Sequence, residues 1–158
     1  MEEVSKIRIS LQSDWIPDIY LNQIRPLRTR SIEMDIPERE NKTELLETLL
    51  GFELKVGSRR IASPNLATAR YLRIFARIGC RNIAVPYDIT AIPVICNDLE
   101  RSWITMNDVL ETERAGRSPQ QLGKLRASVI RLIREEIKKA GAGELMPLFN
   151  KSTKQRSD

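Results

Sequence analysis

The tripeptide Glu53-Leu54-Lys55 holds the pair of residues in this chain best suited to chemistry. It lies in an expected strand, residues 52–56, and side chains two apart on a strand project from the same face. A carboxylate and a lysine on one face can hold a divalent metal ion and a water molecule near a phosphate. The pair therefore suggests metal-assisted hydrolysis of a phosphate ester, although an alternating strand with charged side chains facing solvent has the same spacing.

A second candidate site is a row of arginines in an expected helix, residues 64–78. Arg70, Arg73 and Arg77 have helical spacing and share one face, opposite the apolar one. No Asp or Glu occurs in residues 54–87, and unpaired like charges one turn apart repel by ~0.2–0.5 kcal/mol per pair. An uncompensated row of arginines suggests an anionic partner. The alternative is the solvent-facing side of a helix whose other face packs in the core.

The charge along the chain alternates in four blocks. Residues 1–53 carry net −4, residues 54–87 net +7, residues 88–113 net −5 and residues 114–158 net +7, which together give the overall +5. This basic balance, with a pI near 9.5, favours a nucleic acid, DNA or RNA, as partner. The expected phosphate-contacting residues lie in the two basic blocks: Arg59, Arg60, Arg70, Arg73, Arg77, Arg81, Lys124, Arg131, Arg134 and Lys138.

The sequence also excludes several classes of site. It contains no histidine, which excludes Ser-His-Asp and Cys-His catalysis and histidine-ligated zinc. Cys80 and Cys96 form no C-x-x-C motif, so we expect both to be reduced and packed as small hydrophobes in a cytoplasmic protein. No apolar run is long enough for a membrane span, and no signal peptide is evident, so no membrane partner is expected. We expect no cofactor, except magnesium if the chain is a nuclease.

Local signals predict a core domain, residues 1–112. Gly57-Ser58 suits a hairpin turn, Ser63-Pro64 suits a helix start, and Gly79 suits a helix end. The fold class predicted is α/β or α+β, a small mixed sheet with helices packed on it. The expected strands are 6–12, 31–36, 52–56, 59–62, 82–86 and 103–106, and the expected helices are 42–50, 64–78 and 90–102.

The C-terminal part is predicted to begin with a polar linker, residues 113–117. Ser118-Pro119 followed by Gln121 is a strong start for an amphipathic helix, residues 118–141. A tail, residues 142–158, follows, and its last residues are expected to be disordered. It carries an apolar patch that either docks on the domain or binds another protein: Leu145, Met146, Leu148 and Phe149.

In this order of elements, residues 42–106 resemble the core of PD-(D/E)xK nuclease-like folds. The resemblance implies that Glu53 is a metal ligand and that Lys55 lies beside the attacking water. The family has an Asp on the preceding strand, and the upstream candidates here are Asp35 and Glu33. A magnesium site of this kind would therefore combine Glu53 with Asp35.

Three functions remain open from the sequence. The leading hypothesis is a nucleic-acid-binding accessory protein that uses the arginine row for phosphate contact. The first alternative is a metal-dependent nuclease of the PD-(D/E)xK type. The second is a protein–protein adaptor or assembly subunit, which could be oligomeric and in which basic and acidic blocks pair between subunits.

Overall fold

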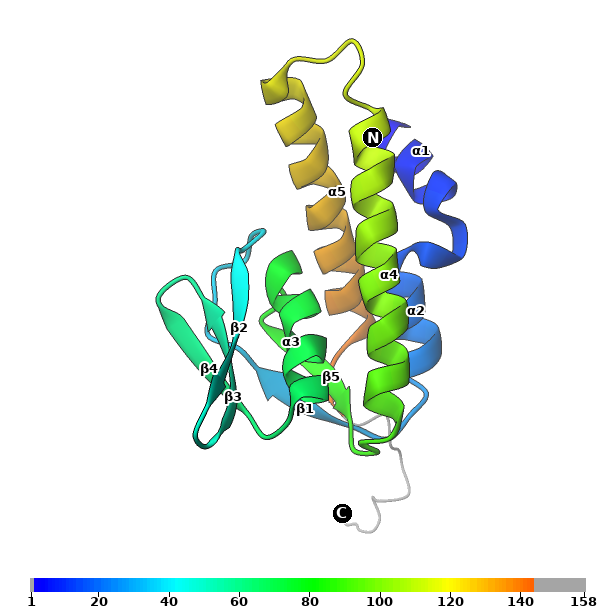
Figure 1. Cartoon of the computed structure of the whole chain (residues 1–158). Coiled ribbons are helices and arrows are strands. Elements are labelled where there is room, and N and C mark those ends of the chain that lie inside the picture. The colour runs from blue at the N-terminus through cyan, green and yellow to red at the C-terminus, as the bar shows by residue number, and fades with distance from the viewer. Residues whose placement is uncertain (1, 144–158) are drawn as a thin grey trace.

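The computed structural model describes residues 2–143, which form a layer of long helices beside two small antiparallel sheets (Figure 1). The α/β class expected from the sequence is confirmed, and the strands form two sheets rather than one mixed sheet. The α-helices are α1 (Glu2–Leu11), α2 (Ile16–Ile19), α3 (Leu66–Ile78), α4 (Ala91–Thr112) and α5 (Pro119–Ala140). The strands are β1 (Thr29–Glu33), β2 (Thr43–Thr48), β3 (Gly51–Val56), β4 (Arg59–Ser63) and β5 (Asn82–Pro86). Two short turns of other helix types, η1 (Gln12–Asp14) and η2 (Tyr20–Ile24), flank α2.

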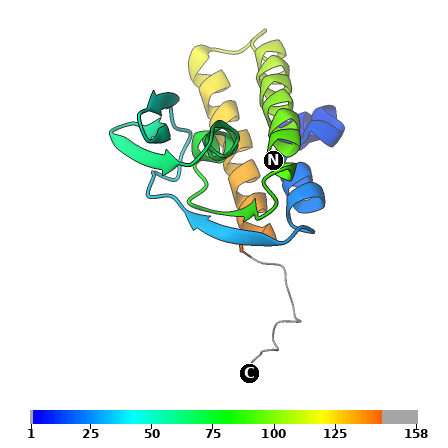
Figure 2. The same cartoon turned by 60° about the horizontal axis from the view of Figure 1, so that its bottom comes forward.

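Helix α3 lies at the centre of the fold. Beyond Leu66 its apolar face is buried, and it packs against the sheet of β2, β3 and β4 as well as against α4 and α5. Helices α1 and α2 pack on the far side of α4 and α5, so the C-terminal helix is part of the core and not a separate arm. The sheet of β1 and β5 crosses the end of the helical layer, as Figure 2 shows, and buries Ile83, Ala84 and Val85.

The ends of α3 follow the signals in the sequence with one shift. The N-cap is Asn65, whose side chain accepts a 2.8 Å hydrogen bond from the Thr68 amide, rather than Ser63. Gly79 ends the helix with φ of +90°, the left-handed conformation in which a glycine C-cap is favoured. A side chain at Gly79 would also collide with the backbone of Arg39, so this position requires glycine for two reasons.

Two segments differ in secondary structure from what the sequence predicted. Residues 6–12 are not a strand but the end of α1 and the start of η1, because Val4, Ile7 and Leu11 bury one helical face. Residues 42–50 are not a helix, because β2 pairs with β3 over its whole length and the following Leu49-Leu50 forms the turn between them. Leu45 and Leu46 lie in the half-buried strand, and Leu49 and Leu50 lie in the exposed turn.

The strand expected at residues 103–106 is also wrong. Helix α4 continues without a break from Ala91 to Thr112, and its buried side chains Ser102, Met106 and Leu110 follow one another at helical spacing. The C-terminal helix starts as predicted, since Ser118 and Gln121 form a reciprocal capping box. No helix in the described part of the chain is long and apolar enough to cross a membrane.

The end of α5 is tied back to the N-terminal helices and β1. The Tyr20 hydroxyl donates to the Gly141 carbonyl at 2.5 Å, and the Arg25 guanidinium donates to the carbonyls of Ala140 and Gly143. The Thr29 hydroxyl donates to Gly143 as well. The apolar patch expected to dock or to bind a partner, Leu145, Met146, Leu148 and Phe149, lies outside the described residues.

Candidate anion-binding site between α3 and α4

The arginine row of α3 faces helix α4 and is not an open, uncompensated ridge. Arg70 donates to both carboxylate oxygens of Glu100 on α4, at 3.0 and 2.6 Å, and to the side-chain oxygen of Asn97 at 3.0 Å. The expectation that no acid compensates these arginines is therefore wrong. It considered only acids near in sequence, whereas Glu100 lies 30 residues further along the chain.

The pair of Arg70 and Glu100 is electrostatically strong. Hydrogen bonds from Arg70 lower the pKa of the Glu100 carboxyl below its ordinary value, and burial opposes this only in part. The same contacts with Glu100 raise the pKa of Arg70. Both groups are therefore charged at neutral pH, and the bidentate geometry fixes the position of Arg70.

The hydrogen-bond donors of Arg73 are less well satisfied than those of Arg70. Its nearest acid is the same Glu100, with 3.9 Å between the guanidinium and the carboxylate. Its Nε is buried, and no atom within residues 2–143 accepts a hydrogen bond from it. A buried donor without a partner costs about 1–3 kcal/mol, so this placement of Arg73 lowers the stability of the fold.

Arg77 completes the row in a half-buried position. Its Nε donates to the Thr43 hydroxyl at 3.2 Å, and its guanidinium carbon lies 5.6 Å from the centre of the Trp103 ring. Burial lowers the pKa of Arg77, and the nearby positive charge of Arg73 lowers it further. The guanidinium of Arg126 on α5 lies 5.8 Å from the same ring, so two cations contact Trp103.

We call Arg70, Arg73, Arg77 and Glu100 the arginine cluster. Arg70 and Arg73 lie within 4 Å of the Glu100 carboxylate, and Arg77 interacts with it electrostatically from further away, so the cluster carries an excess of two positive charges. The side chains of Arg70 and Arg73 are 27% and 25% exposed, so they are screened less than surface arginines yet remain within reach of solvent. Such a cluster has the charge and the donors to bind an anion.

Most of the other predicted phosphate contacts are paired within the chain. Arg59 and Arg81 both approach Asp35, and Arg60 lies 3.0 Å from Glu53. On α5, Arg134 donates to the Ile78 carbonyl at 2.8 Å, and the Lys138 amine lies 3.7 Å from Glu38. The acidic and basic blocks therefore pair inside one chain, whereas the adaptor hypothesis placed these pairs between subunits.

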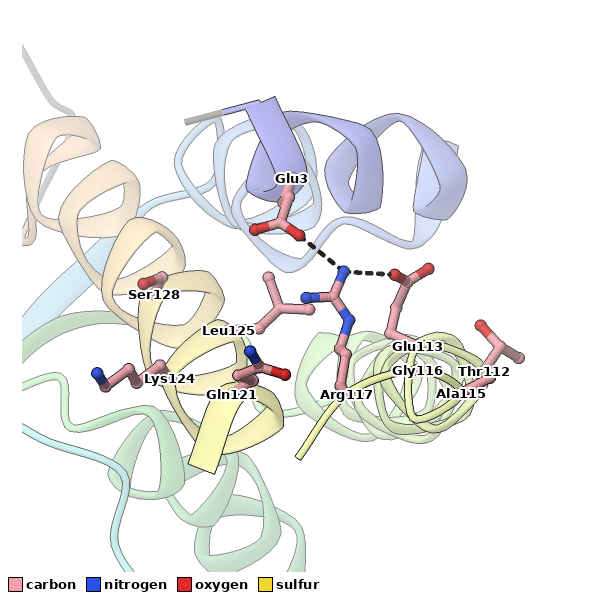
Figure 3. A pocket seen from close by; sticks show the side chains of 10 residues that line it. All are labelled: Glu3, Thr112, Glu113, Ala115, Gly116, Arg117, Gln121, Lys124, Leu125 and Ser128. Atoms are coloured by element: carbon pink, nitrogen blue, oxygen red, sulfur yellow. Dashed lines mark hydrogen bonds and ion pairs between the residues drawn. The ribbon is translucent and has the colours of Figure 1, made fainter. Parts of the chain in front are cut away.

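Lys124 and Arg131 are exposed on α5. Lys124 borders a depression where α1 meets the ends of α4 and α5, and it points away from the centre (Figure 3). The centre is occupied by Arg117, which lies 2.8 Å from Glu3 and 3.1 Å from Glu113. Two carboxylates and one guanidinium leave the centre of this depression without excess positive charge, and Lys124 lies at its margin.

Both acids proposed as metal ligands pair with arginines. Glu53 pairs with Arg60, and Asp35 pairs with Arg59. Arg59 and Arg60 are consecutive residues of β4, and consecutive residues of a strand point to opposite faces of the sheet. Lys55 lies opposite Arg60 and Glu44 in the sheet. Within residues 2–143 no group of three His, Cys, Asp or Glu side chains is positioned to hold a metal ion.

The two cysteines are buried, and no structural feature of residues 2–143 activates them. Burial raises the pKa of the Cys80 thiol to about 12, and burial likewise raises that of Cys96 to about 12, helped by the nearby charge of Glu100. Because the thiolate is the reactive form, both are expected to be inert in the folded protein.

Four members of this site, Asn97, Glu100, Trp103 and Arg126, were not expected from the sequence. The alternation of charged blocks was the signal that could have found Glu100, since an acidic block beside a basic block favours contact between them. Comparison with protein-family models, curated proteins and solved structures finds no match to this chain.

Proposed function

We propose that this protein is a nucleic-acid-binding accessory protein that contacts the phosphate backbone through the arginine cluster. The observation that supports this proposal is the excess of two positive charges around Glu100, carried by arginine side chains that remain partly exposed. A phosphate bound at the partly exposed guanidinium groups would reduce the repulsion between Arg73 and Arg77.

The chemistry of the cluster suits phosphate better than base edges. Guanidinium groups bind phosphate oxygens in a planar, two-pronged geometry, and such contacts position a protein without reading sequence. Arg70 is already held by Glu100, so Arg73 and Arg77 are the principal contacts in this proposal. The exposed Lys124 and Arg131 of α5 are the candidates for a second region of contact.

The test is a binding titration with labelled duplex DNA and labelled single-stranded RNA over a series of salt concentrations. The variant Arg73→Ala/Arg77→Ala is expected to bind at least about tenfold more weakly. Its salt slope should be smaller by about one for each phosphate that the missing guanidinium groups would have neutralised. The matched control is Arg114→Ala, which removes an arginine that is 62% exposed and pairs with Glu111 on α4.

The outcomes separate clearly. A wild-type protein that binds neither polymer at low salt would refute the proposal. The same conclusion follows if the double variant, shown by circular dichroism to be folded, keeps the wild-type affinity and salt slope. If Arg114→Ala weakens binding as much as the double variant, the contact is a general effect of positive charge and not of the cluster.

A further inference from the structure

Large apolar side chains are exposed together at one end of the molecule, which we call the apolar end. Two are the turn residues between β2 and β3, one begins α3, two lie in the loop between β5 and α4, and one lies in the first turn of α4. They are Leu49, Leu50, Leu66, Tyr87, Ile89 and Val94.

The fold brings these segments to the same end. Gly51 packs against the carbonyls of Ser63 and Pro64, so the β2–β3 turn lies next to the start of α3. Helices α3 and α4 begin side by side, since Arg70 and Asn97, each within the first two turns of its helix, are hydrogen-bonded. Figure 1 shows the β2–β3 turn, the start of α3 and the loop before α4 in the lower part of the molecule.

The two turn leucines of the apolar end are almost completely exposed. Leu49 is 103% exposed and Leu50 is 98% exposed, although a tight turn between strands does not require leucine. Removing a leucine side chain from water has a large favourable free energy, so this turn lacks a stabilisation that a contact would supply. Six such side chains offer on the order of several hundred Å², which approaches the ~800 Å² that one partner contributes to a stable interface.

The charges around the apolar end favour a second copy of this chain over a lipid surface. Acidic groups lie within it, since Asp88 separates Tyr87 from Ile89 and Glu47 precedes the turn leucines. These carboxylates would oppose binding to an anionic membrane. Basic charge is also present, because the Arg28 guanidinium lies 5.0 Å from the centre of the Tyr87 ring. A surface with an apolar centre and both signs of charge can complement itself across a two-fold axis.

We propose that the apolar end is the interface of a homodimer. The two-fold axis passes through this end and joins the β2–β3 turn of one copy to the loop before α4 of the other. This interface is independent of nucleic-acid binding, since none of the six side chains belongs to the arginine cluster.

The experiment measures mass in solution by size-exclusion chromatography with light scattering over a range of protein concentrations. The wild-type chain of 18.2 kDa is expected to run at twice its mass and to dissociate on dilution. The variant Leu49→Ser/Leu50→Ser is expected to weaken the dimer at least about 100-fold. It removes side chains that are fully exposed in the described monomer, and its melting curve checks the fold. A second variant, Ile89→Ser/Val94→Ser, tests the other half of the interface.

The matched controls are Ile9→Ser on α1 and Ile104→Ser on α4, which remove exposed apolar side chains away from the apolar end. Both are expected to leave the dimer unchanged. A wild-type monomer at all concentrations would overturn the proposal, as would controls that dissociate the dimer as strongly as the turn variant. Flotation with vesicles of neutral and of anionic lipid tests whether the apolar end binds a lipid surface instead. Wild-type protein that floats with the vesicles while remaining monomeric would also overturn the dimer proposal.

Discussion

Replacing Glu100 by glutamine tests the electrostatic account of the arginine cluster most directly. The substitution keeps the size of the side chain and removes the carboxylate that Arg70 and Arg73 share in the described structure. Glutamine can still accept one hydrogen bond from Arg70, but its amide group cannot accept the second one. The three arginines would then repel one another without a counter-charge.

The expected reduction in stability follows from the geometry. Arg70 donates two hydrogen bonds to the carboxylate, and a hydrogen bond to a charged group contributes about 1.5–3 kcal/mol. Glutamine retains one of them, and the site is about one-quarter exposed, so solvent screens the remaining charge in part. We expect the free energy of unfolding to fall by about 2 kcal/mol. For a chain of this length, that change lowers the melting temperature by about 4–8 °C.

Urea unfolding followed by circular dichroism measures this difference. The control is Glu111→Gln, which removes an acid from the same helix where it pairs with Arg114 and both side chains are 62% exposed. Because an exposed ion pair contributes little to stability, we expect the control to unfold at nearly the same urea concentration as the wild type. If Glu100→Gln also unfolds at the wild-type urea concentration, the cluster contributes no stability and the reasoning is wrong.

The pH dependence provides an independent check on the same pair. Arg70 lowers the pKa of Glu100 below its ordinary value of 4.5, so the pair stabilises the fold fully above that pH. The stabilisation disappears as the pH falls through the lower pKa of the folded state. The difference in stability between the wild type and Glu100→Gln should therefore shrink in acid. A difference that stays constant from neutral pH down to about pH 3 would exclude this ion pair as its cause.

Three further predictions concern the rest of the fold. Cys80 and Cys96 should react with a thiol reagent only after unfolding, because both pKa values are raised to about 12, and labelling of the native protein at about pH 8 would contradict this. Gly79→Ala should lower the free energy of unfolding by about 2 kcal/mol or more, since it forces a side chain into a left-handed residue packed on Arg39; denaturant melts measure it. Tyr20→Phe should cost about 1–3 kcal/mol by the same measurement, because the buried hydroxyl bridges two segments distant in sequence.

The parts of the fold that the sequence predicted are those with local signals. The hairpin around Gly57-Ser58, the end of α3 at Gly79 and the capping box at Ser118 each depend on residues within a few positions of one another. Such signals act through backbone conformation and short hydrogen bonds, so they can be read without knowledge of the rest of the chain.

The errors occurred where packing between distant segments decides the structure. The alternating residues 6–12 suit a strand, but Leu11 and Ile7 lie on the helical face that packs in the core. The leucine-rich residues 42–50 suit a helix, but pairing with β3 makes most of them a strand. Local propensity is a weak guide in both cases, because tertiary contacts override it.

The sequence predicted the arginines of the candidate site but not the residues that surround them. Helical spacing placed Arg70, Arg73 and Arg77 on one face. The structure confirms this, because Arg70 and Arg73 approach Glu100 and Arg77 approaches Trp103, and both of these residues lie on α4. The identity of the compensating acid depended on how α3 packs against α4, and sequence spacing contains no information on that packing. The same limit explains why Trp103 was expected in a strand.

The contacts that tie α5 to the N-terminal segments have a consequence for how the chain acquires its structure. The Trp15 indole donates to Glu136 at 2.8 Å, and Arg25 donates to the backbone at and just beyond the end of α5, across separations of 115 to 121 residues. During synthesis, the apolar faces of α1 and α2 can pack on α4 first, and they are covered completely only when α5 has been made. A protein closed by contacts of such long range should fold slowly for its size and expose its N-terminal helices to chaperones meanwhile.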